Sequence, residues 1–246
     1  MGAFKLSIGT INVAGRHPTR RAVLIGGGAS LLAGCAGTTD VGLVAEPVSP
    51  PPPAPHIVAM YRAMPEERFP IPAVDVAAID PRYLRQEVAF TTAEPVGTII
   101  VDPNAKFLYL VQEGRQALRY GVGVGRVGFG WSGRALINMK REWPTWTPPA
   151  SMIEREPRYA QYADGMEPGL DNPLGARALY LFEDGRDTLY RLHGTSEQWS
   201  IGRAVSSGCI RLFNQDIIDL YERTPLGTTV VVLPSTVEPA ADDPAA

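Results

Sequence analysis

RLHGTSEQWSIGRAVSSGCIRLFNQD (residues 191–216) holds His193 and Cys209, sixteen positions apart. The run up to the histidine, TLYRLHGT, is typical of a strand, and the glycine before the cysteine indicates a sharp turn. NQDIIDLYERT (214–224) then predicts a helix, because its apolar residues recur at helical spacing. Asn214 is the expected N-cap of that helix. A strand, a turn and a helix therefore surround a lone thiol.

Cysteine and histidine are scarce in the chain, which has two cysteines and three histidines. His17 and His56 lie in the N-terminal quarter of the sequence, so His193 is the only imidazole near Cys209. A thiol needs a base or a cation to become a good nucleophile near neutral pH. A Cys-His pair is one interpretation; a buried structural cysteine beside an ordinary histidine is the other.

The residues beside Cys209 favour the catalytic interpretation. Ser207 and Gly208 allow a sharp backbone turn, so the amides of Gly208 and Cys209 can point at a developing oxyanion. One histidine and one cysteine are too few ligands for a zinc site, so we expect no metal and no cofactor.

Short β-branched and aromatic runs dominate the sequence from residue 97 onward, with turn residues between them. About seven or eight strands are predicted, in GTIIVD, KFLYLVQEG, QALRYGVGVG, ALINMKREW, ARALYLFE, TLYRLHGT and GTTVVVLP. This pattern predicts a mainly β fold, a mostly antiparallel sandwich or barrel over residues 96–235, with one short helix after Cys209.

The segment 148–175 has little periodicity, and a connection of that length is often a lid. Five of its residues, which either contact a ligand or are structural, are Met152, Arg155, Tyr159, Asn172 and Gly175. Trp143 and Trp146, just before it, either line a cleft or belong to the core.

The N-terminal part of the chain is typical of an exported lipoprotein. Residues 1–34 carry paired arginines and a short apolar stretch, a twin-arginine-like signal peptide that ends in a lipobox. Cys35 is the expected lipidation site, and residues 35–57 form a proline-rich linker. We expect residues 58–95 to be an extension that packs on the domain and 236–246 to be a disordered tail. The predicted location is periplasmic, with a lipid anchor in the outer membrane.

Charge argues against a nucleic-acid partner. The formal net charge is −3, and residues 1–34 hold four of the 23 basic residues and none of the 26 acidic ones. The remainder therefore has 19 basic against 26 acidic residues, a net of −7. Such a body offers no basic face to nucleic acid.

RLHGT (191–195) followed by SSGCIRL (206–212) resembles the L,D-transpeptidase (YkuD) catalytic domain, over roughly residues 96–235. The resemblance implies that Cys209 is the nucleophile and His193 its base. It also implies that the Gly194 carbonyl orients the imidazole and that the Gly208 amide serves the oxyanion hole. Residues expected near the substrate are Ser206, Ser207, Arg211, Trp143 and Trp146. Arg211 would buttress the site or meet a substrate carboxylate; a solvated surface arginine is the alternative.

The implied substrate is the stem peptide of peptidoglycan. Cys209 would attack the carbonyl at the L-centre of the third stem residue, release D-alanine and pass the acyl group to an amine. The acceptor would be another stem, the lysine of a wall-linked lipoprotein or a D-amino acid. Two alternatives stay open: a hydrolase of the same bonds (a carboxypeptidase or a lipoprotein–peptidoglycan amidase), and an inactive wall-binding module. The last is suggested by Ser207, which stands where the family usually has a second histidine.

Overall fold

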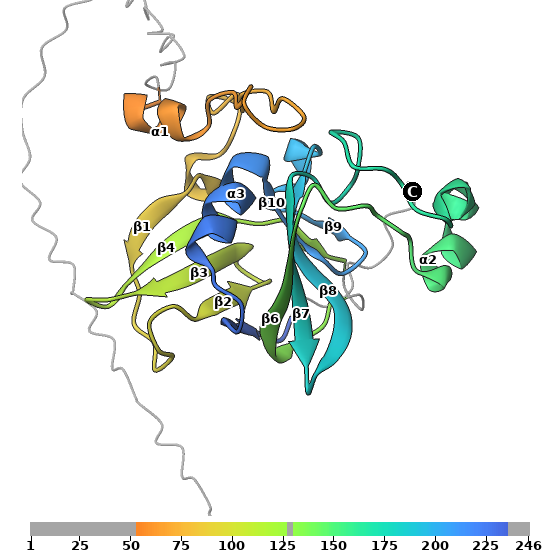
Figure 1. Cartoon of the computed structure of the whole chain (residues 1–246). Helices are drawn as coiled ribbons and strands as arrows, with labels where there is room; N and C mark the ends of the chain where they lie inside the picture. Colours follow the sequence, from red (N-terminus) through yellow and green to blue (C-terminus); the bar gives the residue numbers. More distant parts are fainter. Residues whose placement is uncertain (1–52, 127–129, 236–246) are drawn as a thin grey trace, which may run out of the picture. The chain divides into compact units, whose positions relative to one another are not determined.

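The computed structural model describes residues 53–126 and 130–235. Strands dominate these residues, as predicted (Figure 1). The elements up to residue 142 are α1 (Pro55–Met60), η1 (Pro81–Tyr83), β1 (Gln86–Ala89), β2 (Ile99–Asp102), β3 (Phe107–Gln112), β4 (Gln116–Gly121), β5 (Val124–Gly125) and β6 (Gly133–Glu142). The others are α2 (Ala150–Arg155), η2 (Pro157–Tyr162), β7 (Arg177–Glu183), β8 (Arg186–Thr195), η3 (Gln198–Ser200), β9 (Ala204–Ser206), β10 (Ile210–Phe213), α3 (Asn214–Arg223) and β11 (Thr229–Val232).

Nine of these strands form one sheet in the order β1-β4-β3-β2-β11-β6-β7-β8-β10, and β5 pairs with β9 separately. Most neighbours in the large sheet are antiparallel, which confirms the predicted class. Two pairs of the large sheet are parallel, β8 with β10 and β2 with β11. A parallel pair requires a crossover connection of about a dozen residues or more. The fourteen residues between β8 and β10 supply one, and this crossover separates His193 from Cys209.

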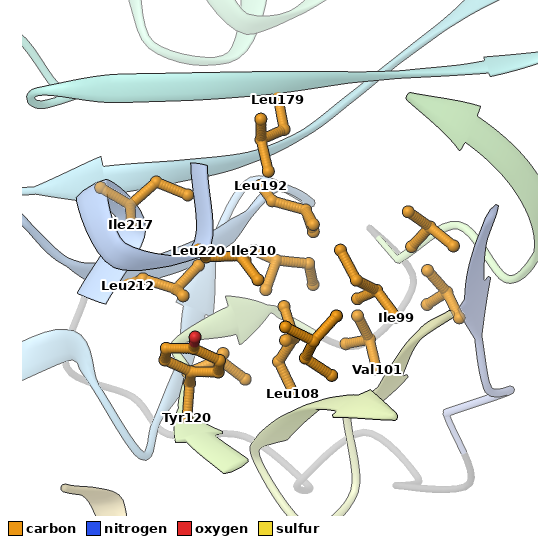
Figure 2. Packing of buried hydrophobic residues seen from close by; sticks show 14 of the residues in the cluster. Ile99, Val101, Leu108, Tyr120, Leu179, Leu192, Ile210, Leu212, Ile217 and Leu220 are labelled. Atoms are coloured by element: carbon orange, nitrogen blue, oxygen red, sulfur yellow. The ribbon is translucent and has the colours of Figure 1, made fainter. Parts of the chain in front are cut away.

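A single large apolar cluster lies between the curved sheet and helix α3 (Figure 2). Strand residues supply most of it, including Ile99, Leu108, Leu179, Leu192 and Leu212, all fully buried. The helix contributes Ile217 and Leu220, which are also fully buried. The helical spacing of the apolar residues after the cysteine therefore packs α3 directly against the strands that carry the site.

Helix α3 begins where the sequence predicted, but Asn214 is not its N-cap. Asn214 is the first helical residue, and the N-cap is Phe213, whose side chain cannot accept a hydrogen bond. The buried Asn214 amide oxygen instead accepts a 3.0 Å hydrogen bond from the Ala176 backbone N–H, at the start of β7. A tertiary partner thus takes the oxygen that a cap would have used.

Replacing Asn214 with alanine should destabilise the fold by about 1–3 kcal/mol, because the buried Ala176 N–H then loses its acceptor. Urea unfolding followed by circular dichroism measures this change. The exposed Asn138 on β6 offers a matched control, and Asn138→Ala should stay within about 0.5 kcal/mol of the wild type. Equal unfolding midpoints for Asn214→Ala and Asn138→Ala would contradict the assigned role of Asn214.

The segment before β1 packs against α3 through a buried tyrosine. The Tyr61 hydroxyl donates to Asp216 Oδ2 at 2.9 Å and accepts from the Arg85 N–H at 2.6 Å. The Tyr61 ring meets Phe213 edge-on, at 5.6 Å between centroids. Burial raises the pKa of Asp216 to about 7, with Arg85 opposing the rise. Residues before the large sheet therefore hold the start of the helix that follows the cysteine strand.

Candidate active site

Strand register brings His193 and Cys209 to one face of the sheet. In the parallel pair of β8 and β10, Arg211 lies opposite His193 and Ile210 lies opposite Leu192. Because side chains alternate along a strand, Arg211 points to the same face as His193. Cys209 directly precedes β10, and continuing the register by one residue sets it opposite Arg191 on that face. Ile210 and Leu192 point the other way, into the apolar core. The register thus places two residues that are sixteen positions apart in sequence on the same face of the sheet.

The His193 side chain is buried, with 4% of its surface exposed, and it is fixed by its own strand. Its Nδ1 lies 2.6 Å from the carbonyl oxygen of Gly194. A carbonyl can only accept, so Nδ1 carries the proton and, in the neutral ring, Nε2 keeps its lone pair. Burial lowers the pKa of His193 to about 4, and the charge of Arg211 adds to this. The imidazole is therefore neutral at pH 7 and able to accept a proton.

Cys209 is a free thiol and is partly exposed. Its Sγ lies 3.9 Å from the carbonyl oxygen of Leu189, which is a weak contact. Burial raises the pKa of the thiol, although the Arg191 backbone N–H and guanidinium oppose the rise. Among the described residues, no hydrogen bond joins Sγ to His193 in this resting arrangement. The site thus holds a thiol beside a neutral base rather than a preformed ion pair.

The turn before the thiol is held by Ser206. Its hydroxyl donates to the Cys209 carbonyl at 2.6 Å and accepts from the Gly208 N–H at 3.2 Å. Gly208 has φ 129°, a backbone conformation that glycine adopts readily and that residues with a Cβ disfavour. The Gly208 N–H was expected to be free for an oxyanion, whereas here it is engaged by Ser206. Ser206 is therefore a buried residue of the turn, and Ser207 is half-buried beside it.

Arg211 forms an ion pair with Glu197. Its guanidinium donates to Glu197 Oε2 at 2.6 Å, and its side chain is 17% exposed. Glu197 lies in the crossover between β8 and β10, directly before η3. Arg211 thus ties the crossover to the cysteine strand and is not a freely solvated surface arginine.

The two tryptophans have different surroundings. Trp143 is buried against Phe69, and its Nε1 donates to Glu67 Oε2 at 2.9 Å. Of its two predicted roles, the core is therefore the one observed. Trp146 is half-buried, and its ring meets Tyr159 edge-on at 5.4 Å between centroids. Trp146 thus packs against the segment predicted as a lid.

The segment 148–175 is more regular than the sequence indicated, since it contains α2 and η2. Asn172 is structural: its side-chain nitrogen donates to the carbonyls of Pro144 and Met166, each at 3.1 Å. Gly175 is structural as well. It has φ 62°, and a Cβ there would collide with Asn214 and with the Gly194 backbone. The three remaining candidates lie on the helical turns: Met152 and Tyr159 are half-buried, and Arg155 is exposed.

The predicted signal peptide, Cys35, most of the proline linker and the tail 236–246 lie outside the described residues. Within 53–126 and 130–235, no helix is long and apolar enough to cross a membrane. The same residues contain no group of three or more histidine, cysteine or acidic side chains placed to hold a metal ion.

Sequence reasoning missed two residues next to the thiol, Asp187 and Arg191. They form an ion pair on β8, with Oδ1 of Asp187 2.6 Å from Arg191 Nη1. Arg191 precedes His193 by two positions, so it shares the face of the site. The two-residue spacing from His193 could have identified Arg191 from the sequence. Its ion pair with Asp187 could not be identified in this way, because it depends on an irregularity in the pairing of β8 with β7.

The model of the YkuD family, described as the L,D-transpeptidase catalytic domain, matches residues 97–232, more than half of the chain. A probable L,D-transpeptidase, YbiS of Escherichia coli K12, is 34% identical over 153 residues, covering 58% of this chain and 46% of the relative. The probable L,D-transpeptidase ErfK/SrfK of the same strain is 38% identical over 120 residues, covering 46% and 37%. The chain thus spans less than half the length of these relatives.

Among solved structures, one titled a probable carnitine operon oxidoreductase from Brucella melitensis is 50% identical, with a TM-score of 0.44. The match covers 63% of this chain and 97% of that chain. An L,D-transpeptidase from Mycobacterium smegmatis is 17% identical, with a TM-score of 0.39, covering 56% and 58%. TM-scores this low carry no argument about function.

Proposed function

The chain belongs to the L,D-transpeptidase catalytic domain family, and we propose that it transfers an acyl group between peptidoglycan peptides, with Cys209 as nucleophile. The observation that carries the proposal is the register of β8 and β10, which sets the thiol and a neutral imidazole on one face. Nδ1 of the imidazole lies against the Gly194 carbonyl, so we assign the role of base to Nε2. This combination serves nucleophilic acyl transfer.

In the proposed reaction, His193 Nε2 takes the thiol proton while Sγ attacks the carbonyl at the L-centre of the third stem residue. The carbon–nitrogen bond to D-alanine then breaks, and His193 returns the proton to the leaving amine. The product is a thioester on Cys209. An acceptor amine attacks the thioester carbon, gives up its proton and releases the thiol.

We propose that the Cys209 N–H stabilises the oxyanion that forms during the attack. The Gly208 N–H joins it when its 3.2 Å contact with Ser206 opens, since that contact is at the long end for a hydrogen bond. A donor of this kind contributes about 2.7–4 kcal/mol to transition-state stabilisation. Ser207 supplies a hydroxyl in place of the family's second histidine, so it donates or accepts a hydrogen bond without carrying charge.

The experiment that tests this proposal combines intact mass with product analysis. One sample of the purified chain is mixed with a penem, and a separate, untreated sample is mixed with tetrapeptide muropeptides. We expect a covalent adduct on Cys209 and dimers cross-linked between two third residues. Trimmed monomers without dimers would show that the chain hydrolyses the thioester, with water as the acceptor, and does not transfer the acyl group to an amine. If the chain forms no adduct and leaves the muropeptides unaltered, the proposal is overturned and the inactive wall-binding module remains.

We also propose that the protein is exported and held at the outer membrane by a lipid on Cys35. The sequence before this cysteine, with its arginine pair and apolar stretch, supports the proposal. Fractionation of cells that express Cys35→Ser tests it. The serine variant should leave the membrane fraction, and a variant that stays equally membrane-bound would refute lipid anchoring at this residue.

A further inference from the structure

Strand β8 is irregular directly beside Cys209. Tyr180 of β7 pairs with Arg191, and Phe182 pairs with Asp187. One residue of β7 therefore faces three residues of β8, so β8 bulges at residues 188–190. Bulges of this kind redirect strand residues and are over-represented next to active sites.

The bulge centres on Leu189, which adopts φ 64°. A bulky residue in this region of backbone space is an outlier, so other contacts must hold it. Asp187 Oδ1 accepts from the Leu189 N–H at 2.8 Å, and the Thr188 hydroxyl donates to the Leu181 carbonyl at 2.7 Å. These contacts point the Leu189 carbonyl at the Cys209 sulfur, 3.9 Å away.

Arg191 is held rigidly on the far side of the bulge. Its guanidinium donates to both oxygens of Asp187, at 2.6 and 2.8 Å, and to the Tyr190 carbonyl at 3.0 Å. It also lies over the Tyr180 ring, 4.3 Å from the centroid. Only 13% of the side chain is exposed. The cation is therefore anchored by more than its ion pair.

We propose that Asp187 and Arg191 are positioning residues that shape the bulge at Leu189 and place a fixed positive charge beside the nucleophile, so that Cys209 reacts more readily as a thiolate. The register supports this, because Cys209 directly precedes Ile210 and so lies opposite Arg191. The proposal rests on Cys209 being the nucleophile of the proposed function.

Several charged or titratable groups face the thiol from β7, β8 and β10: Tyr180, Asp187, Tyr190, Arg191, His193 and Arg211. The charge of Arg211 is offset by Glu197 at 2.6 Å. Arg191 lowers the pKa of the thiol against the dominant effect of burial, and Asp187 raises it. The two partners of one ion pair thus act on the thiol with opposite sign.

This opposition gives a test that needs no substrate. In the full chain carrying Cys35→Ser, Cys209 is the only cysteine, so the rate of its alkylation by iodoacetamide can be followed against pH. Arg191→Met should raise the thiol pKa and slow alkylation near neutral pH roughly three- to tenfold. Asp187→Asn should lower the thiol pKa and speed alkylation, because Tyr190 and Tyr180 still anchor Arg191 and an amide oxygen still accepts from Leu189.

The controls separate charge from shape. Arg191→Lys keeps the cation and should recover most of the lost rate, while Arg186→Met removes an exposed cation of the same hairpin and should change the rate less than twofold. Shifts of the same direction in Arg191→Met and Asp187→Asn, or no shift in either, would overturn the proposal. If Arg191→Met and Asp187→Asn shift the alkylation rate in opposite directions but the wild-type chain forms no cross-links, the electrostatic role of the ion pair stands and the transpeptidase function is rejected.

Discussion

Replacing Cys209 with serine should lower the rate of acyl transfer by roughly a thousandfold or more. The change keeps the shape of the side chain, so the turn built by Ser206 and Gly208 stays intact. A hydroxyl is a far weaker acid than a thiol, and a neutral imidazole with a pKa of about 4 is a weak base for removing its proton. The loss should therefore appear in the acylation step.

Dimer formation from muropeptides measures the Cys209→Ser rate, and intact mass after penem treatment shows whether an acyl-enzyme forms. Cys35→Ser is the matched control, since it makes the same substitution at the other cysteine of the chain. In detergent solution, Cys35→Ser should act at the wild-type rate. A Cys209→Ser chain that retains more than a tenth of wild-type activity would rule out the thiol as nucleophile.

The fold class could be read from the sequence because its signals are local. Alternating β-branched runs predict strands, and the apolar spacing after Cys209 predicts helix α3 within one residue of its observed end. Parallel pairing of β8 with β10 had no local signal, because it depends on where a fourteen-residue crossover returns. Asn214 shows the same limit: its side chain suits a cap, but a distant backbone N–H takes its oxygen.

The site followed a similar division. The scarcity of cysteine and histidine left Cys209 and His193 as the one thiol–imidazole combination within residues 96–235, and the register then placed them on one face. The bulge at Leu189 could not be read, because it arises from unequal strand lengths between two pairing positions. At Gly208 the glycine predicted the turn correctly, but the direction of its N–H could not be predicted, because the Ser206 hydroxyl accepts from it.

Replacing His193 with glutamine should lower acyl transfer about a hundred- to ten-thousandfold, because the thiol then lacks its base. The wild-type pH profile should also carry the signature of this histidine. Burial and Arg211 lower its pKa from 6.5 to about 4, so the neutral, active form persists as the pH falls through 6.5. The acid limb of kcat/KM should therefore lie near pH 4, and His193→Gln should lose that limb.

His56 provides the control for His193, since it is exposed on α1 and lies in the described part of the chain. His56→Gln should keep the wild-type rate and the wild-type acid limb. Initial rates of dimer formation between pH 3.5 and 8 measure both variants, with circular dichroism at each pH to confirm that the chain stays folded. An acid limb of kcat/KM near 6.5 in the wild type would mean that His193 is solvated in the free enzyme, and that its burial does not tune the base. A limb near 4 that survives in His193→Gln would assign the titration to another group and remove His193 from the proton transfer.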